Sequence, residues 1–309
     1  MIDQPCYLFD WLVPEDIQDK AKFLDISIKF SENGNWVFRG IPRWYSLETR
    51  LERVFNNVNV LPTKRPERER QLIQEFKRRA HHYLNLLPGN DDITGWLALM
   101  QHYGAPTRLL DWTYSFFIAS YFALSDADSK EKSELPSNDK SREDCYVIAI
   151  KCDDLKLEKQ SAQAYESYRI GSKKIPYPVD FLCADTDHVQ NGINAFLWDV
   201  METPKKCVWS INSFRLNERQ SVQQGVFLCP GDITYSFIDN LQVGNPSPEN
   251  LKLFKLSTER NTRTDILRLL YRMNINHTSL FPGLSGFAES LRHKLWIPET
   301  LRPKDPQNL

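Results

Sequence analysis

Residues 101–124 read QHYGAPTRLLDWTYSFFIASYFAL and join a polar stretch to an apolar one. Residues 114–124 are apolar on nearly every face of a helix, which predicts a helix buried in the domain centre. Residues 101–113 crowd polar groups near its N-terminus, which Asp111 or Thr113 can cap. Burying such groups is costly unless they bond one another or a ligand, and helix N-termini favour anions such as phosphate. The segment therefore predicts either a ligand site or a self-contained Arg108–Asp111 network.

Short runs of β-branched and aromatic residues on either side of this segment predict strands. In residues 36–40, alternation places Trp36 and Phe38 on one face of the strand and Val37 and Arg39 on the other. The irregular spacing of the strands argues against a regularly alternating α/β fold. We expect an α+β fold, in which helices from residues 67–124 pack against one mixed, mostly antiparallel sheet. Its expected strands start near Trp36, Cys145, Val208, Val222 and Leu251.

Apolar residues at helical spacing predict amphipathic helices over residues 67–87, 92–103 and 264–275, with Gly104 as the C-terminal cap of the second. Residues 125–144 contain almost nothing apolar, which is typical of a solvated insertion rather than a domain boundary. We therefore expect residues 1–309 to form a single domain that carries this polar insertion.

The composition of the chain excludes several classes of protein and of binding site. The 309 residues carry 39 Lys and Arg against 40 Asp and Glu, so the net charge of −1 excludes the global positive field of a dedicated nucleic-acid binder. The first twenty residues lack the pattern of an export signal, and no apolar run reaches the roughly 18 residues of a spanning helix. The 6 cysteines show no zinc-ligand spacing. We expect a cytoplasmic protein with reduced thiols, no membrane contact and no metal.

Four motifs together resemble the FRG domain, a family named for its Phe-Arg-Gly triplet. They are WVFRG at residues 36–40, QHYGAPTRLLDWT at 101–113, QQGVF at 223–227 and LFPGLSG at 280–286. The central motif is long enough to make chance improbable, whereas the triplet alone would be a weak match. The resemblance implies one FRG domain from about residue 35 to the C-terminus. It also implies a bacterial or phage protein, often in an antiviral defence or toxin setting.

An aromatic-Arg-Gly at the end of an early strand also resembles the Arg-Ser-Glu class of ADP-ribosyltransferases. That resemblance implies that Arg39 holds a phosphate or ribose of NAD and that Thr107 or Thr113 stands at the Ser/Thr position. Gln223 or Gln224 would stand where the class has a glutamate, and a glutamine cannot carry the charge that stabilises a cationic transition state. Either Asp111 or Glu218 then supplies the carboxylate, or the pocket binds a nucleotide without turning it over.

We expect the dispersed polar residues to share one pocket for NAD or a related adenine nucleotide. Arg39 or Arg108 would contact the diphosphate, Asp111 or a glutamine amide a ribose hydroxyl, and Trp112 or Tyr103 the base. The expected catalytic residues are Arg39, Asp111 and Gln224, and the expected nucleotide-binding residues are Gln101, His102, Thr107, Arg108, Thr113 and Gln223.

Two alternatives remain open. One is a hydrolase or nuclease built on Asp111 and His102 with Arg108 on a phosphate. The other is a non-catalytic module that senses a nucleotide or nucleic acid, or that binds another protein. The acceptor of any ADP-ribose, protein or nucleic acid, is not specified by the sequence.

Overall fold

The computed structural model describes residues 8–32, 36–42, 47–125, 145–151, 194, 197–198, 200–212, 217–257 and 260–294. The predicted insertion at 125–144 lies outside these residues apart from Ser125, as do Cys6, Cys152 and Cys183. The described cysteines Cys145, Cys207 and Cys229 are buried thiols. No helix in the described ranges has both the length and the apolar character needed to span a bilayer.

The described strands form one seven-stranded sheet in the order β1-β7-β4-β2-β3-β6-β5. The β1–β7 pair is parallel, and the other neighbours are antiparallel, so the predicted α+β fold with a mostly antiparallel sheet is confirmed. The strands are β1 (Glu15–Ile17), β2 (Trp36–Ile41), β3 (Leu110–Thr113), β4 (Cys145–Lys151), β5 (Val208–Ile211), β6 (Gly225–Pro230) and β7 (Leu251–Leu256).

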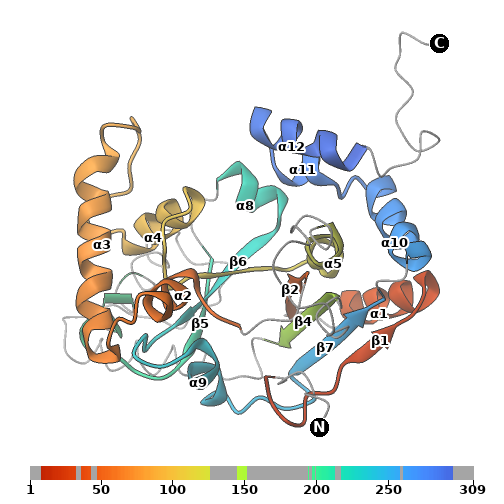
Figure 1. Ribbon diagram of the computed structural model, residues 1–309, viewed down its shortest axis with the longest axis horizontal. Coiled ribbons are helices and arrows are strands. Elements are labelled where there is room, and N and C mark those ends of the chain that lie inside the picture. Colours follow the sequence, from red (N-terminus) through yellow and green to blue (C-terminus); the bar gives the residue numbers. More distant parts are fainter. Residues whose placement is uncertain are drawn as a thin grey trace.

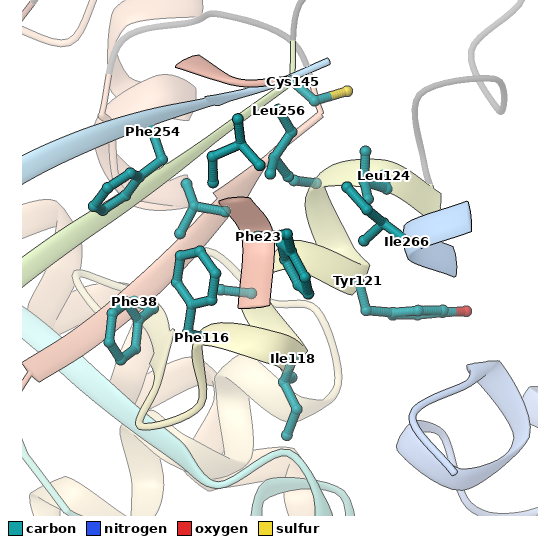
Figure 2. Packing of buried hydrophobic residues seen from close by; sticks show 14 of the residues in the cluster. Phe23, Phe38, Phe116, Ile118, Tyr121, Leu124, Cys145, Phe254, Leu256 and Ile266 are labelled. Atoms are coloured by element: carbon teal, nitrogen blue, oxygen red, sulfur yellow. The ribbon is translucent and has the colours of Figure 1, made fainter. Parts of the chain in front are cut away.

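One face of the sheet is covered by α1 (Lys20–Glu32), α5 (Phe116–Ser125) and α10 (Arg260–Arg272), which lie together in Figure 1. Aromatic rings fill the layer between: Phe38 from β2 and Phe254 from β7 both contact Phe116 of α5 edge-on (Figure 2). Such edge-to-face pairs add stabilisation beyond the area that they bury. The helix over residues 114–124 is therefore buried as predicted, although it begins at Phe116.

Helix α5 lies unusually close to β2. A Cβ on Gly40 would come within 2.0 Å of the main-chain oxygen of Ala119 and 2.7 Å of the nitrogen of Ala123. Only glycine permits this approach, because any side chain would overlap the helix backbone. The glycine of the strand thus fixes how tightly the buried helix packs on the sheet.

The opposite face carries Val37 and Ile41 of β2 and packs against α9 (Phe237–Gln242). This confirms the alternation predicted for residues 36–40, since Trp36 and Phe38 belong to the face under α5. Towards the β5 end of the sheet, a third apolar cluster joins α3 (Arg65–Ala80) and α4 (Ile93–His102) to β6 through Ile73, Leu97 and Phe227.

The remaining described elements are α2 (Arg50–Asn57), the 3-10 turn η1 (Pro62–Lys64), α8 (Glu218–Val222), α11 (His277–Leu280) and α12 (Leu284–Lys294). Three predicted boundaries were wrong. Helix α3 ends at Ala80 rather than near 87, which leaves Tyr83 82% exposed. Helix α10 ends at Arg272, and the strand expected from Val222 begins at Gly225 because 218–222 form a helix.

Candidate functional site

A pocket of about 600 Å³ opens between α4, α5 and α8, where β2, β3 and β6 lie side by side. Its charged lining comes from Arg39, Glu48, Arg53, Asp111 and Arg219. A volume of this size is typical of small-molecule sites, which range from about 300 to 1,000 Å³. The other described residues that line it are Phe38, Gly40, Pro42, Ala98, Gln101, His102, Trp112, Thr113, Phe122, Asn217, Gln220, Gln223 and Phe227.

Arg39 lies at the pocket and ties two strands together. Its Nη1 donates a hydrogen bond to the main-chain oxygen of Asp111 on β3. The two residues are therefore in contact, although they lie 72 positions apart in the sequence. This bond holds the guanidinium at the pocket without using the carboxylate of Asp111.

Among the described residues of the pocket lining, two buried donors have no hydrogen-bond partner. They are Nε of Arg39 and Nε1 of Trp112, the latter in a residue only 3% exposed. Phe38 of β2 pairs with Thr113 of β3 on neighbouring antiparallel strands. Arg39 comes directly after Phe38, and Trp112 comes directly before Thr113. A buried donor without a partner costs about 1 to 3 kcal/mol, and such groups are rare in folded proteins. Both residues line the pocket, so an acceptor atom of a ligand that reached either N–H group would be stabilised there.

The carboxylate of Asp111 is exposed to the pocket and hydrogen-bonded to α4. Gln101 donates from Nε2 to Oδ2 of Asp111 at 2.9 Å, and the hydroxyl of Thr107 donates to Oε1 of Gln101 at 2.5 Å. Thr107 itself is 1% exposed and is absent from the pocket lining. Of the predicted binding residues, Gln101 therefore reaches the pocket, whereas Thr107 acts behind it.

His102, in the last turn of α4, also lines the pocket. Burial lowers the pKa of His102, and the nearby Arg219 lowers this pKa further. Both effects favour the neutral imidazole, which offers one donor and one acceptor nitrogen. The neighbouring Tyr103 is 58% exposed and does not line the pocket, so only Trp112 of the two predicted aromatic residues is placed there.

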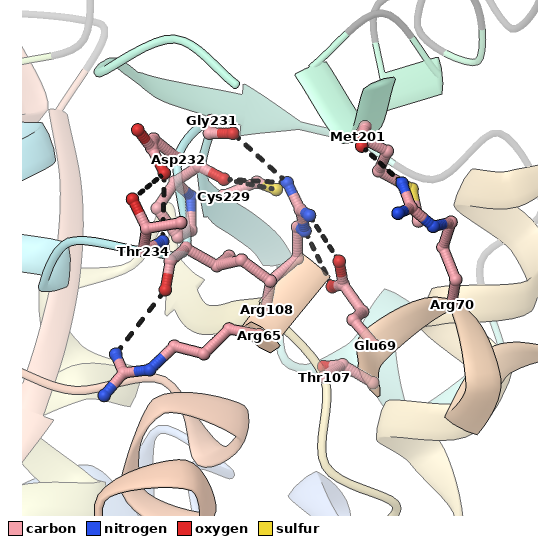
Figure 3. Close-up of polar contacts among 12 residues, drawn as sticks. Arg65, Glu69, Arg70, Thr107, Arg108, Met201, Cys229, Gly231, Asp232 and Thr234 are labelled. Carbon is pink, nitrogen blue, oxygen red and sulfur yellow. Dashed lines mark hydrogen bonds and ion pairs between the residues drawn. The ribbon is translucent and has the colours of Figure 1, made fainter. Parts of the chain in front are cut away.

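Arg108 lies away from the pocket, in a buried ion pair that Figure 3 shows. Its Nε donates to Oε1 of Glu69 at 2.7 Å, its Nη2 bonds the second carboxylate oxygen, and its Nη1 reaches the carbonyls of Pro230 and Gly231. Burial opposes the charge on Arg108, but Glu69 outweighs it and raises the pKa of the guanidinium. The predicted pairing with Asp111 was wrong, because Glu69 of α3 occupies the guanidinium, and Arg108 has no path to a ligand in this pocket.

Gln223 and Gln224 were predicted to lie on one strand, but they follow the end of helix α8 instead. Gln223 lines the pocket, and its Nε2 donates to the main-chain oxygen of Leu280. The main-chain oxygen of Gln223 accepts a hydrogen bond from the Thr113 hydroxyl. Gln224 has a left-handed backbone with φ 48°, is exposed and lies outside the lining, as does Glu218.

Thr113 lines the pocket and accepts a hydrogen bond from Ser115 N, while the Ser115 hydroxyl accepts one from Ile118 N at the start of α5. Neither Asp111 nor Thr113 therefore caps that helix.

Sequence reasoning missed the pocket residues Glu48, Arg53, Asn217, Arg219 and Gln220. A local signal exists for one stretch: Asn217 and Gln220 form a capping box, a pattern that predicts the start of α8. That pattern does not say which way α8 faces. Arg219 gains its position from tertiary packing, with its guanidinium 4.5 Å above the ring of Phe281.

A family model of the FRG domain matches residues 34–132. The chain contains an FRG domain. Each residue of the FRG triplet has a separate position: Phe38 packs under α5, Arg39 holds β3 and lines the pocket, and Gly40 admits α5. The FRG match ends within 126–144, while β4 to β7 of the same sheet follow later in the chain. Neither a curated protein nor a solved structure matches the chain.

Proposed function

We propose that the pocket beside the FRG triplet binds NAD or a related adenine nucleotide. The observation that carries the proposal is the pair of buried, unpartnered donors, Nε of Arg39 and Nε1 of Trp112, in the lining of one pocket. A diphosphate presents several acceptor oxygens, and arginine forms short, charge-assisted bonds with phosphate. Such a ligand would satisfy both donors, whereas an apolar ligand would leave them unpaired.

The remaining lining supports a ligand that is anionic at one end and flat at the other. Arg39, Arg53 and Arg219 outnumber the carboxylates Glu48 and Asp111 among the described lining residues. Partly buried Phe122 adds aromatic surface against which a base can lie, next to the small exposed edges of Phe38, Trp112 and Phe227. The net charge of −1 favours such a pocket-sized anion over a long polyanion.

Asp111 gives the pocket a group suited to chemistry at a ribose. Its carboxylate can accept a hydrogen bond from a ribose hydroxyl and stabilise positive charge at C1′. In NAD hydrolysis or ADP-ribosyl transfer, the bond between C1′ and the nicotinamide nitrogen breaks and its electron pair leaves with nicotinamide. Water or an acceptor hydroxyl then adds to C1′ and releases its proton. An NAD-consuming activity would fit the defence or toxin setting that the FRG resemblance implies.

Calorimetry with NAD, ADP-ribose, AMP and adenosine tests the binding. A charge-assisted phosphate contact contributes about 1.5 to 3 kcal/mol. Arg39→Ala should therefore lower the affinity for the three phosphorylated ligands by about tenfold to a hundredfold and leave the affinity for adenosine unchanged. Arg78→Ala is the matched control, because Arg78 lies on α3 with its side chain 80% exposed. Equal binding by wild type and Arg39→Ala, or no binding by the wild type, would overturn the proposal.

A further inference from the structure

Three side chains form a directed chain of hydrogen bonds that ends in the pocket. The amide N–H of Leu109 donates to Oγ1 of Thr107 at 3.2 Å, and Thr107 Oγ1 donates its own proton to Oε1 of Gln101 at 2.5 Å. Gln101 then donates from Nε2 to Oδ2 of Asp111 at 2.9 Å. The main-chain oxygen of Thr107 accepts from Leu51 N, which fixes the buried end of the chain.

The two ends of this chain of hydrogen bonds each have only one role open to them. A main-chain N–H only donates, and an ionised carboxylate only accepts. The amide of Gln101 must therefore turn its NH₂ group towards Asp111 and its oxygen towards Thr107. An amide oxygen in that place needs a donor, and the hydroxyl of Thr107 supplies it. The opposite orientation would set the amide oxygen against the carboxylate, where two acceptors repel each other.

We propose that Thr107 and Gln101 are positioning residues that hold Asp111 as an acceptor for the hydroxyl groups of a ligand sugar. The inference rests on the proposed nucleotide site and narrows its ligand class to nucleoside diphosphates that carry a second sugar. Oδ2 of Asp111 is occupied by Gln101, and Asp111 is exposed to the pocket. The carboxylate keeps acceptor capacity, since two oxygens can accept about four hydrogen bonds.

The fixed orientation makes the site selective. A ligand that ends in a sugar brings hydroxyl donors to the carboxylate. One that ends in a phosphate brings a second anion there, which the carboxylate repels. ADP-ribose should accordingly bind the wild type more tightly than ADP does, by about tenfold, the ratio expected for one well-placed hydrogen bond to a charged group.

Thr107→Val and Thr107→Ser form the matched pair that tests this role. Valine keeps the shape of threonine but removes the hydroxyl, so Gln101 loses its donor and the preference for ADP-ribose over ADP should fall to about twofold or less. Serine keeps the hydroxyl and should keep the preference. Calorimetry with both ligands on wild type, both Thr107 variants and Asp111→Asn measures it.

A second measurement needs no ligand. The side-chain NH₂ resonances of Gln101 in an ¹⁵N correlation spectrum report the orientation of the amide. They should shift in Thr107→Val and in Asp111→Asn and stay near their wild-type positions in Thr107→Ser. Asp111 is exposed, so its variant reports from the other end of the chain even if Thr107→Val folds poorly.

The outcomes separate the two proposals. If the wild type prefers ADP-ribose and Thr107→Val keeps that preference with unchanged Gln101 resonances, the positioning role is overturned and the nucleotide site stands. If the wild type binds no nucleotide, the proposed function and the sugar preference both fail. The Gln101 resonances then decide whether Thr107 orients the amide at all.

Discussion

Nη1 of Arg39 donates to the main-chain oxygen of Asp111, which joins the FRG triplet to the central motif across neighbouring strands. The bond uses one of the five N–H donors of the guanidinium and leaves the carboxylate of Asp111 to Gln101. The cation and the carboxylate therefore stand at one pocket without neutralising each other directly. This separation lets a ligand use both groups.

Trp112→Phe tests the donor that lacks a partner. The change keeps an aromatic ring but removes the buried Nε1–H, so binding of ADP-ribose should weaken about fivefold to tenfold, while binding of adenosine should change little. Trp96→Phe is the matched control, because Trp96 is also 3% exposed but its Nε1 donates to Gly89 O at 2.8 Å outside the pocket. It should lower stability and leave affinity unchanged in the same calorimetry. A loss of affinity in both variants would contradict the special role of Trp112.

The sequence was sufficient to predict the parts of the fold that depend on local pattern. The strand from Trp36, the strand Leu251–Leu256 and the buried helix each carry the apolar run or alternation typical of their structure. The strands β1 and β3 were not predicted. Strand β3 has only the residues Leu110–Thr113, and its pairing with β2 and β6 is what makes it a strand.

The sequence predicted that several dispersed polar residues share the pocket, but it did not predict the position of Arg108, which depends on a tertiary contact. Arg39, Gln101, His102, Asp111 and Gln223 do line one pocket, as their dispersal through apolar patterns predicted. The burial of Arg108 was not predictable, because Glu69 lies 39 positions earlier on an arginine-rich helix that offers two other carboxylates. A charged residue in a motif can thus serve the core as readily as the ligand.

Gly40→Ala tests the close approach of α5 to β2. The new Cβ would overlap main-chain atoms of Ala119 and Ala123, which cannot rotate away as a side chain can. We expect the free energy of unfolding to fall by more than about 3 kcal/mol, as measured by urea denaturation. Gly89→Ala is the control, because a Cβ there meets nothing within 4 Å. It should be neutral or stabilise by up to about 1 kcal/mol. A mild effect of Gly40→Ala would mean that α5 can move off the sheet.

Glu69→Gln tests the buried ion pair. The variant leaves the guanidinium of Arg108 without a counter-charge in a site where both side chains are at most 3% exposed. We expect a loss of about 3 to 5 kcal/mol in urea denaturation, since a buried charge without its partner is strongly unfavourable. Glu75→Gln removes an exposed partner of Arg79 on the same helix and should cost no more than about 1 kcal/mol. The double variant Glu69→Leu with Arg108→Met removes both charges and should be more stable than Glu69→Gln. The reverse order would contradict the view that the unpaired charge of Arg108 causes the loss of stability.

Glu52 should make stability fall as pH rises. Burial raises the pKa of Glu52 from 4.5 to about 7, although the N–H of Phe237 donates to its carboxylate at 3.1 Å and partly opposes the rise. Between these two values the unfolded chain has released the proton while the folded protein still holds it, so each step up in pH favours unfolding. The contribution of Glu52 should therefore decline by about 2 to 3 kcal/mol across this window and stay level above it.

Glu52→Gln isolates this effect, because glutamine keeps an acceptor oxygen for Phe237 and cannot ionise. Urea denaturation of wild type and variant at about pH 4.5 and about pH 8 gives the difference in unfolding free energy at each pH. The variant should gain on the wild type by about 2 to 3 kcal/mol between the two, while the exposed Glu75→Gln shows no such gain. A constant difference would show that the Glu52 carboxyl titrates alike in the folded and unfolded chain, and the fold would then hold the carboxylate without cost.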